Sequence, residues 1–148
     1  MRTYLSANEF VIPAKILIVE DEMLVACEVD AVLGELGREV VGIASDMETA
    51  LTVAMQQIDL ALVDLNLRDG PTGPEIGKHL CARGDVAVFH VTANPRILYE
   101  GISGAIGVMT KPVVEASVRH AVDYALRVRA GDAAAVPPRS LRLFQQAA

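Results

Sequence analysis

Short apolar runs alternate along this chain with longer stretches in which apolar residues recur every three or four positions. A short continuous apolar run is typical of a strand that is covered on both faces of a sheet. We therefore predict strands at residues 16–19, 40–44, 60–63, 86–91 and 106–109.

The stretches between these runs predict helices. The first helical pattern ends at Gly37, a residue suited to the end of a helix. Capping-box spacings at Ser45 and Thr72 open the second and third helices, and Asn94 followed by proline opens a short fourth helix. The predicted helices cover residues 25–36, 45–54, 72–80, 95–98 and 114–125.

Strict alternation of five strands and five helices predicts an α/β fold, a doubly wound parallel sheet with helices on both faces. We expect an N-terminal extension at 1–14, one domain at 15–130, and an Ala/Pro-rich tail at 131–148. The tail is expected to be flexible. Docking on a surface remains the alternative, through Leu141, Leu143 and Phe144.

Composition narrows the classes of partner. The net charge is -6 and the pI is about 5.0, so the chain lacks the positive surface that nucleic acid needs. No apolar run approaches the roughly 20 residues that span a bilayer. The first residues also lack the apolar segment of a signal peptide. We expect a cytoplasmic protein with no membrane or nucleic-acid partner.

Polar residues follow four of the predicted strands, at Glu20-Asp21-Glu22, Asp64, Thr92 and Lys111. Because a doubly wound sheet binds ligands at the carboxyl ends of its strands, we expect these residues to converge. Two carboxylates about 4 Å apart repel by on the order of 4 kcal/mol at an effective dielectric near 20. A divalent cation removes that cost, and an all-oxygen ligand set favours Mg²⁺.

A carboxylate beside such an ion can attack phosphorus as a nucleophile, and Lys111 would neutralise the charge of the transferred group. The three histidines have no metal-ligand spacing, and we predict structural or exposed roles for His79, His90 and His120.

These residues resemble the receiver domains of two-component response regulators. The resemblance covers about residues 15–130 and rests on four motifs in order: ILIVEDE (16–22), ALVDLNLRDGPTG (61–73), VTAN (91–94) and TKP (110–112). It implies a stand-alone receiver with a flavodoxin-like sheet of strand order 2-1-3-4-5.

By position, the resemblance implies that Asp64 is the phosphorylated aspartate. Asp21 and Asp64 would be direct Mg²⁺ ligands, Glu20 would assist through water, and the backbone carbonyl of Asn66 would complete the protein's share. The cofactor implied is therefore Mg²⁺.

The resemblance further implies that Thr92 and Lys111 sense the phosphoryl group. The sequence departs from the family at Val108, three residues before Lys111, where a Tyr or Phe often rotates inward with the threonine. A smaller rearrangement or a different output face would follow from this departure.

The resemblance also implies partners. Phosphoryl donors would be a histidine kinase, a phosphotransfer protein or a small acyl phosphate. The chain would signal by binding a downstream protein, relaying phosphate or draining it from a kinase, and would not be an enzyme in its own right. Receiver domains often form homodimers through helix four, strand five and helix five.

Two alternatives stay open. A phosphatase of the haloacid-dehalogenase kind also uses a strand-end aspartate with Mg²⁺, but it has a second Asp two residues later, where this chain has Asn66. A degenerate receiver would act only as a binding surface.

Overall fold

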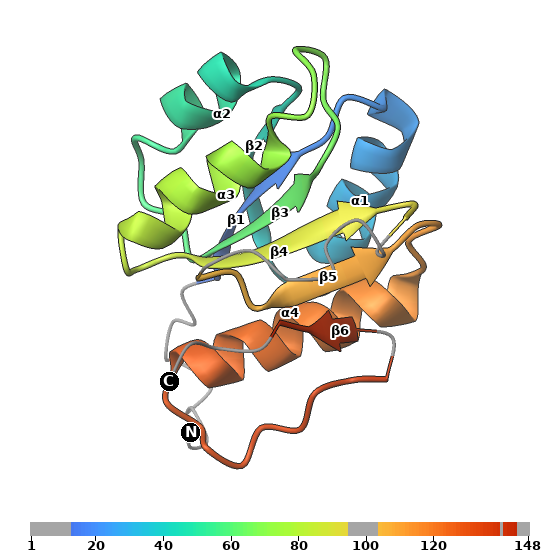
Figure 1. Ribbon diagram of the computed structural model, residues 1–148. Helices are drawn as coiled ribbons and strands as arrows, with labels where there is room; N and C mark the ends of the chain where they lie inside the picture. The colour runs from blue at the N-terminus through green and yellow to red at the C-terminus, as the bar shows by residue number, and fades with distance from the viewer. Residues whose placement is uncertain (1–12, 95–103, 140, 145–148) are drawn as a thin grey trace.

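The computed structural model describes residues 13–94, 104–139 and 141–144 (Figure 1). One sheet of six strands forms its centre, in the order β2-β1-β3-β4-β5-β6. The first five are parallel, as predicted, and their order confirms the doubly wound fold. They are β1 (Lys15–Val19), β2 (Glu39–Ala44), β3 (Leu60–Asp64), β4 (Ala87–Thr92) and β5 (Gly107–Thr110).

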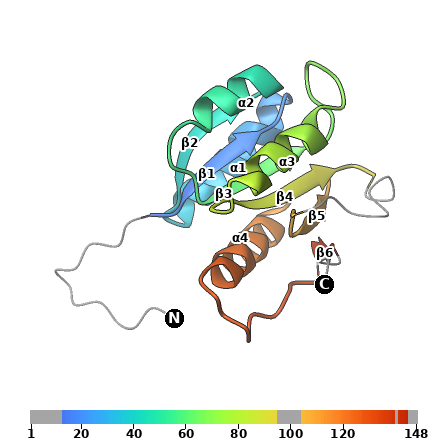
Figure 2. The ribbon, with the colours of Figure 1, turned by 60° about the vertical axis from the view of Figure 1, so that its left-hand side comes forward.

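Helices cover both faces of this sheet (Figures 1 and 2). On one face lie α2 (Met47–Val53) and α3 (Gly73–Ala82), and on the other lie α1 (Met23–Glu35) and α4 (Glu115–Arg129). Each pair packs on its own apolar cluster, as expected for strands buried on both faces. The predicted short helix at 95–98 lies outside the described residues.

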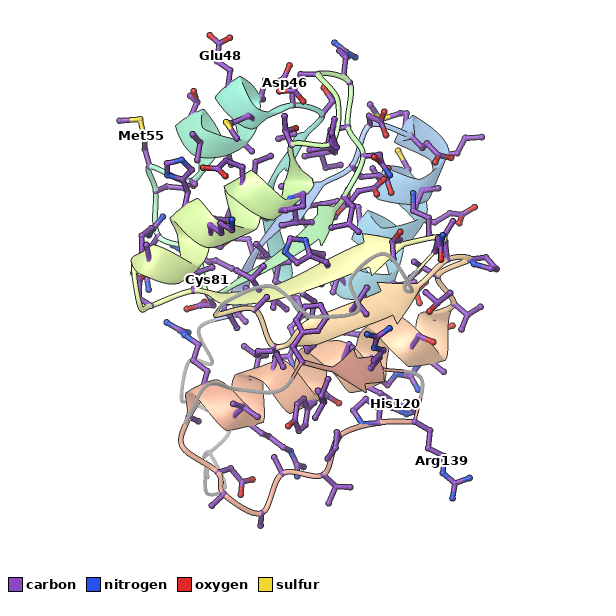
Figure 3. The ribbon with its side chains drawn as sticks, viewed as in Figure 1. Asp46, Glu48, Met55, Cys81, His120 and Arg139 are labelled. Atoms are coloured by element: carbon purple, nitrogen blue, oxygen red, sulfur yellow. The ribbon has the colours of Figure 1, made fainter. Side chains whose placement is uncertain are left out.

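The start of α2 differs by one residue from the prediction. Asp46, labelled in Figure 3, is the N-cap, and its Oδ1 accepts a hydrogen bond from the Thr49 amide at 2.8 Å. Ser45 is therefore not the capping residue. Aspartate and serine cap helices equally well, so spacing to Glu48 alone could not choose between adjacent candidates.

The expectation of a wholly flexible tail is wrong for its end. Residues Leu141–Leu143 form β6, which pairs antiparallel with β5. The physical reason is burial, since Leu141 and Phe144 are 6% and 7% exposed. Before β6, the chain runs along α4, where His120 and Arg139 line one cavity (Figure 3).

Within the described residues, no helix has both the length and the apolarity to cross a membrane.

Candidate functional site

The carboxyl ends of β1, β3, β4 and β5 bring the predicted site residues to one edge of the sheet. Asp64 is the last residue of β3, and Thr92 is the last residue of β4. Glu20 follows β1 directly, and Lys111 follows β5. The parallel register aligns these ends, because Val19 pairs with Val63 on the neighbouring strand.

The Lys111 ammonium lies among the carboxylates. Its Nζ is 2.9 Å from Glu20 Oε1, 2.9 Å from Asp64 Oδ2 and 3.2 Å from Glu22 Oε1. Glu22, which the sequence groups with the strand-end carboxylates but assigns no role of its own, is thus an ion-pair partner of the lysine. The peptide bond from Lys111 to Pro112 is cis.

The three carboxylates that pair with this lysine form one group with that of Asp21. Oxygen atoms of Glu20, Asp21, Glu22 and Asp64 all lie within 4.8 Å of one another. A single ammonium cannot neutralise four carboxylates, and an oxygen-only set of this kind suits a hard divalent cation such as Mg²⁺. The residues present therefore fit the metal that the sequence predicts.

Burial strengthens the repulsion among these carboxylates. Glu20 is 5% exposed, and burial together with a hydrogen bond to Asp64 raises its pKa from 4.5 to about 7. Burial also opposes the charge of Lys111, but hydrogen bonds and ion pairs with Asp64 and Glu20 outweigh it and hold its pKa above the ordinary value. A cation at this site would favour the ionised form of Glu20.

Asp64 is held in place by the loop that follows it. The Asn66 amide donates to Asp64 Oδ1 at 3.3 Å, and the Gly73 amide donates to the Leu65 carbonyl at 3.1 Å. A Cβ atom at Gly73 would lie 2.0 Å from the Asp64 carbonyl oxygen. Only glycine lets the start of α3 approach the end of β3 this closely.

Thr92 closes the other side of the site. Its Oγ1 accepts a hydrogen bond from the Asn94 amide at 3.1 Å, which leaves the hydroxyl hydrogen free to be donated to an incoming oxygen. The Lys111 amide donates to the Thr92 carbonyl at 2.8 Å. Together with Asp64 and Asn66, these residues line an open cavity of about 310 Å³.

His90 lies beneath the site, inside the core. Its Nδ1 is 3.1 Å from the Val63 carbonyl, which can only accept, so Nδ1 carries the hydrogen. Burial lowers the pKa of this imidazole to about 4, so the ring is neutral. A Cβ at Gly77 would come within 2.5 Å of Nε2, so the glycine on α3 makes room for the ring.

Comparisons with known proteins agree with this geometry. The family model described as response regulator receiver domain matches residues 16–123. The chain is 32% identical over 115 residues to the Phyllosphere-induced regulator PhyR of Methylorubrum extorquens. That alignment covers 76% of this chain and 43% of the relative, so the chain spans less than half of the relative's length.

Solved structures show the same likeness. The response regulator PhyR from Brucella abortus superimposes with a TM-score of 0.71 at 27% identity, over 81% of this chain and 50% of that one. The PhyR response regulator REC domain of Erythrobacter litoralis gives 0.69 at 28% identity, over 77% and 90%. Since the family model matches most of the chain and the fold agrees, this chain belongs to the response regulator receiver domain family.

Proposed function

We propose that this chain accepts a phosphoryl group on Asp64 in a Mg²⁺-dependent reaction and signals through a protein partner. One observation carries the proposal: Asp64 is paired with Lys111 at 2.9 Å inside a group of four carboxylates, at the edge of an open cavity. A nucleophile, a cation and a metal-binding set at one strand end are the parts that phosphoryl transfer needs.

The residues divide the work as follows. A carboxylate oxygen of Asp64 attacks the phosphorus of the donor and forms a P–O bond. The bond from phosphorus to the donor's nitrogen or oxygen breaks, and its electron pair leaves with the donor. Lys111 and the Thr92 hydroxyl would face the new phosphoryl oxygens and offset their charge. A Mg²⁺ ion held by Asp21, Asp64, the Asn66 carbonyl and, through water, Glu20 would supply further charge neutralisation.

The phosphoryl donor would be a histidine kinase, a phosphotransfer protein or a small acyl phosphate. A solved PhyR from Bartonella quintana, an anti-anti-sigma factor, is similar to this chain at 25% identity and a TM-score of 0.68. That likeness supports a protein partner for this chain, reached by direct binding, by relay or by draining phosphate. A homodimer through strand five would have to accommodate β6, which occupies the outer edge of β5.

The receiver family favours this function over that of a haloacid-dehalogenase-like phosphatase. The general acid that such an enzyme places two residues after its nucleophile is absent, because that residue is Asn66.

Mass spectrometry after incubation with Mg²⁺ and a small acyl phosphate tests the acceptor. The wild-type chain should gain one phosphoryl group, and Asp64→Asn should gain none. Asp85→Asn is a matched control, since Asp85 precedes β4 at the opposite edge of the sheet. An unchanged gain in Asp64→Asn would disprove the assignment.

Thermal melting tests the metal separately. Mg²⁺ should raise the melting temperature of the wild-type chain, because an ion that binds only the folded state stabilises it. The effect should be much smaller in Asp21→Asn. A wild-type chain with no Mg²⁺-dependent shift would favour the degenerate receiver, which acts only as a binding surface.

A further inference from the structure

The outer edge of β5 is occupied by a strand from the end of the same chain. Gly107 pairs with Leu143, Val108 with Arg142, and Met109 with Leu141 in antiparallel register. The pairing continues beyond β6, where the Phe144 amide donates to the Ile106 carbonyl at 2.9 Å. In Figure 1, β6 lies beside β5, at the edge of the sheet.

The first residue of this strand and the residue that follows it, Leu141 and Phe144, are buried, whereas Arg142 and Leu143 between them are exposed. Leu141 belongs to the apolar cluster under α1 and α4, whereas Phe144 belongs to the cluster under α2 and α3. Successive side chains of an extended segment point to opposite faces, so Leu141 and Phe144, three positions apart, reach the two faces of the sheet. Phe144 also places an aromatic ring in the cluster that contains Val108, the position where the family often has an aromatic.

Gly107 lets β6 approach β5 closely. We call the outer edge of β5 at residues 107–109, with which β6 pairs, the strand seat. A Cβ at this position would lie 2.4 Å from the Arg142 carbonyl oxygen and 3.1 Å from the Leu143 Cα. All three of the nearest atoms that such a Cβ would meet belong to β6. The backbone of β5 is therefore specifically open to a closely approaching strand at this point.

Residues 130–139 lead from the end of α4 towards β6. The backbone hydrogen bonds of residues 130–139 lie within the segment, reach the end of α4, as from the Asp132 amide to the Arg127 carbonyl, and reach β6, where the Pro138 carbonyl accepts from the Leu141 amide. Val136 is 81% exposed. β6 is held in place by its pairing with β5 and by the burial of Leu141 and Phe144.

We propose that the outer edge of β5 is a strand-binding site, filled here by residues 141–144, and that a protein partner binds it with an extended segment of the same pattern. That pattern places apolar residues opposite Met109 and Gly107, and an aromatic residue after them. Backbone hydrogen bonds would supply affinity, and the apolar clusters that receive Leu141 and Phe144 would supply selectivity. The site exists whether or not Asp64 is phosphorylated.

Hydrogen exchange of the full chain tests whether β6 is packed closely against the outer edge of β5. In the wild type, the amide of Phe144 should be protected, because it is bonded to Ile106. Gly107→Ala should increase exchange in residues 142–144 at least tenfold and leave β1 and β3 unchanged. Gly34→Ala is the matched control, since a Cβ there meets nothing within 4 Å. Unchanged exchange in Gly107→Ala would overturn the close-packed seat.

Peptide binding tests the site as a binding surface. The probe is a fluorescent peptide with the sequence of residues 138–148, PRSLRLFQQAA. A chain with Leu141→Asp and Phe144→Asp should release β6 and bind this peptide at least tenfold more tightly than the wild type, as measured by fluorescence anisotropy. Adding Gly107→Ala should abolish binding. We call the Leu141→Asp, Phe144→Asp variant the released chain. Protection of its β1 and β3 amides from hydrogen exchange shows that its sheet remains folded.

Three outcomes would overturn the proposal. Equal binding by the wild-type and released chains would mean that the peptide does not compete for the β5 edge, and no binding by a folded released chain would mean that the edge takes no strand in trans. A wild-type dimer that Gly107→Ala abolishes would overturn the choice of a separate partner, because a second copy would then be the occupant.

Discussion

Gly73 lies so close to the end of β3 that no side chain fits between them. A Cβ would lie 2.0 Å from the Asp64 carbonyl oxygen and 2.6 Å from the Leu65 Cα, and both are backbone atoms that cannot turn away. Gly73→Ala should therefore lower the free energy of unfolding by about 2 kcal/mol or more. Urea denaturation followed by circular dichroism measures this loss.

Gly34 supplies the contrast for this substitution. It lies in α1, and a Cβ there meets no atom within 4 Å. Gly34→Ala should raise the free energy of unfolding by up to about 1 kcal/mol, because alanine favours the helix. Equal stability of Gly73→Ala and the wild type would show that the loop after Asp64 shifts easily enough to make room for the added methyl group.

Glu20 makes the metal-free protein sensitive to pH. Its pKa is 4.5 in the ordinary state and about 7 in the fold, because of burial and the hydrogen bond to Asp64. Between these values the folded chain holds a proton that the unfolded chain has lost. Stability is therefore fully present below about pH 4.5 and falls as the pH rises towards about 7, by on the order of 2 kcal/mol.

Urea denaturation without metal, at about pH 5 and about pH 7.5, measures this slope. Glu20→Gln should flatten it, and Glu28→Gln, an exposed position on α1, should not. Mg²⁺ should offset the loss at the higher pH, because the cation favours ionised carboxylates. An identical slope in Glu20→Gln would assign the pH dependence to another group.

The polar residues of the site could be predicted because they stand directly after apolar runs. Parallel strands place those positions at one edge, which is why Asp64, Thr92 and Lys111 are found together. The ion pair from Lys111 to Glu22 and the neutral state of His90 could not be predicted. They depend on side-chain distances of a few ångströms across separate strands, which no spacing in the sequence encodes.

Among the elements, the start of α2 depends on a single side chain. The Thr49 amide donates to Asp46 Oδ1, and the Thr52 hydroxyl bonds the Glu48 carbonyl within the same helix. Asp46→Ala should lower the melting temperature by roughly 2–4 °C, because the first turn loses its acceptor. Differential scanning calorimetry measures this shift.

Two controls separate capping from charge. Asp46→Asn should retain most of the stability, since asparagine caps helices as well as aspartate does. Ser45→Ala should have little effect, since Ser45 does not cap α2. A larger loss in Ser45→Ala than in Asp46→Ala would return the capping role to Ser45.

Elements with strong periodicity were predictable, and the short terminal strand was not. Five apolar runs and the helical stripes between them predicted the parallel strands, and the resemblance to receiver domains implied their order, which the sheet confirms. β6 has only three residues, which alternate apolar, charged and apolar, and its stability comes from pairing with β5. A pattern this short carries too little signal to be distinguished from a flexible Ala/Pro-rich tail.

At the scale of the whole molecule, β5 connects the proposed phosphoryl-acceptor site to the proposed strand-binding edge. Its residues 107–109 pair with β6, and the chain then passes through Thr110 to Lys111 among the carboxylates. A phosphoryl group on Asp64 would draw Lys111 towards its oxygens and away from its present partners. Since packed strands move as units, a shift at this end of β5 reaches its paired edge.

We therefore expect phosphorylation to loosen β6. With Mg²⁺ and a small acyl phosphate, amides of residues 142–144 should exchange about fivefold faster or more, which corresponds to about 1 kcal/mol of opening free energy. Asp64→Asn should show no change, and Gly107→Ala should already exchange fast in the absence of phosphate. Unchanged exchange in a chain that has gained its phosphoryl group would mean that the seat and the acceptor site act independently. A partner strand would then compete for β5 equally well in both states.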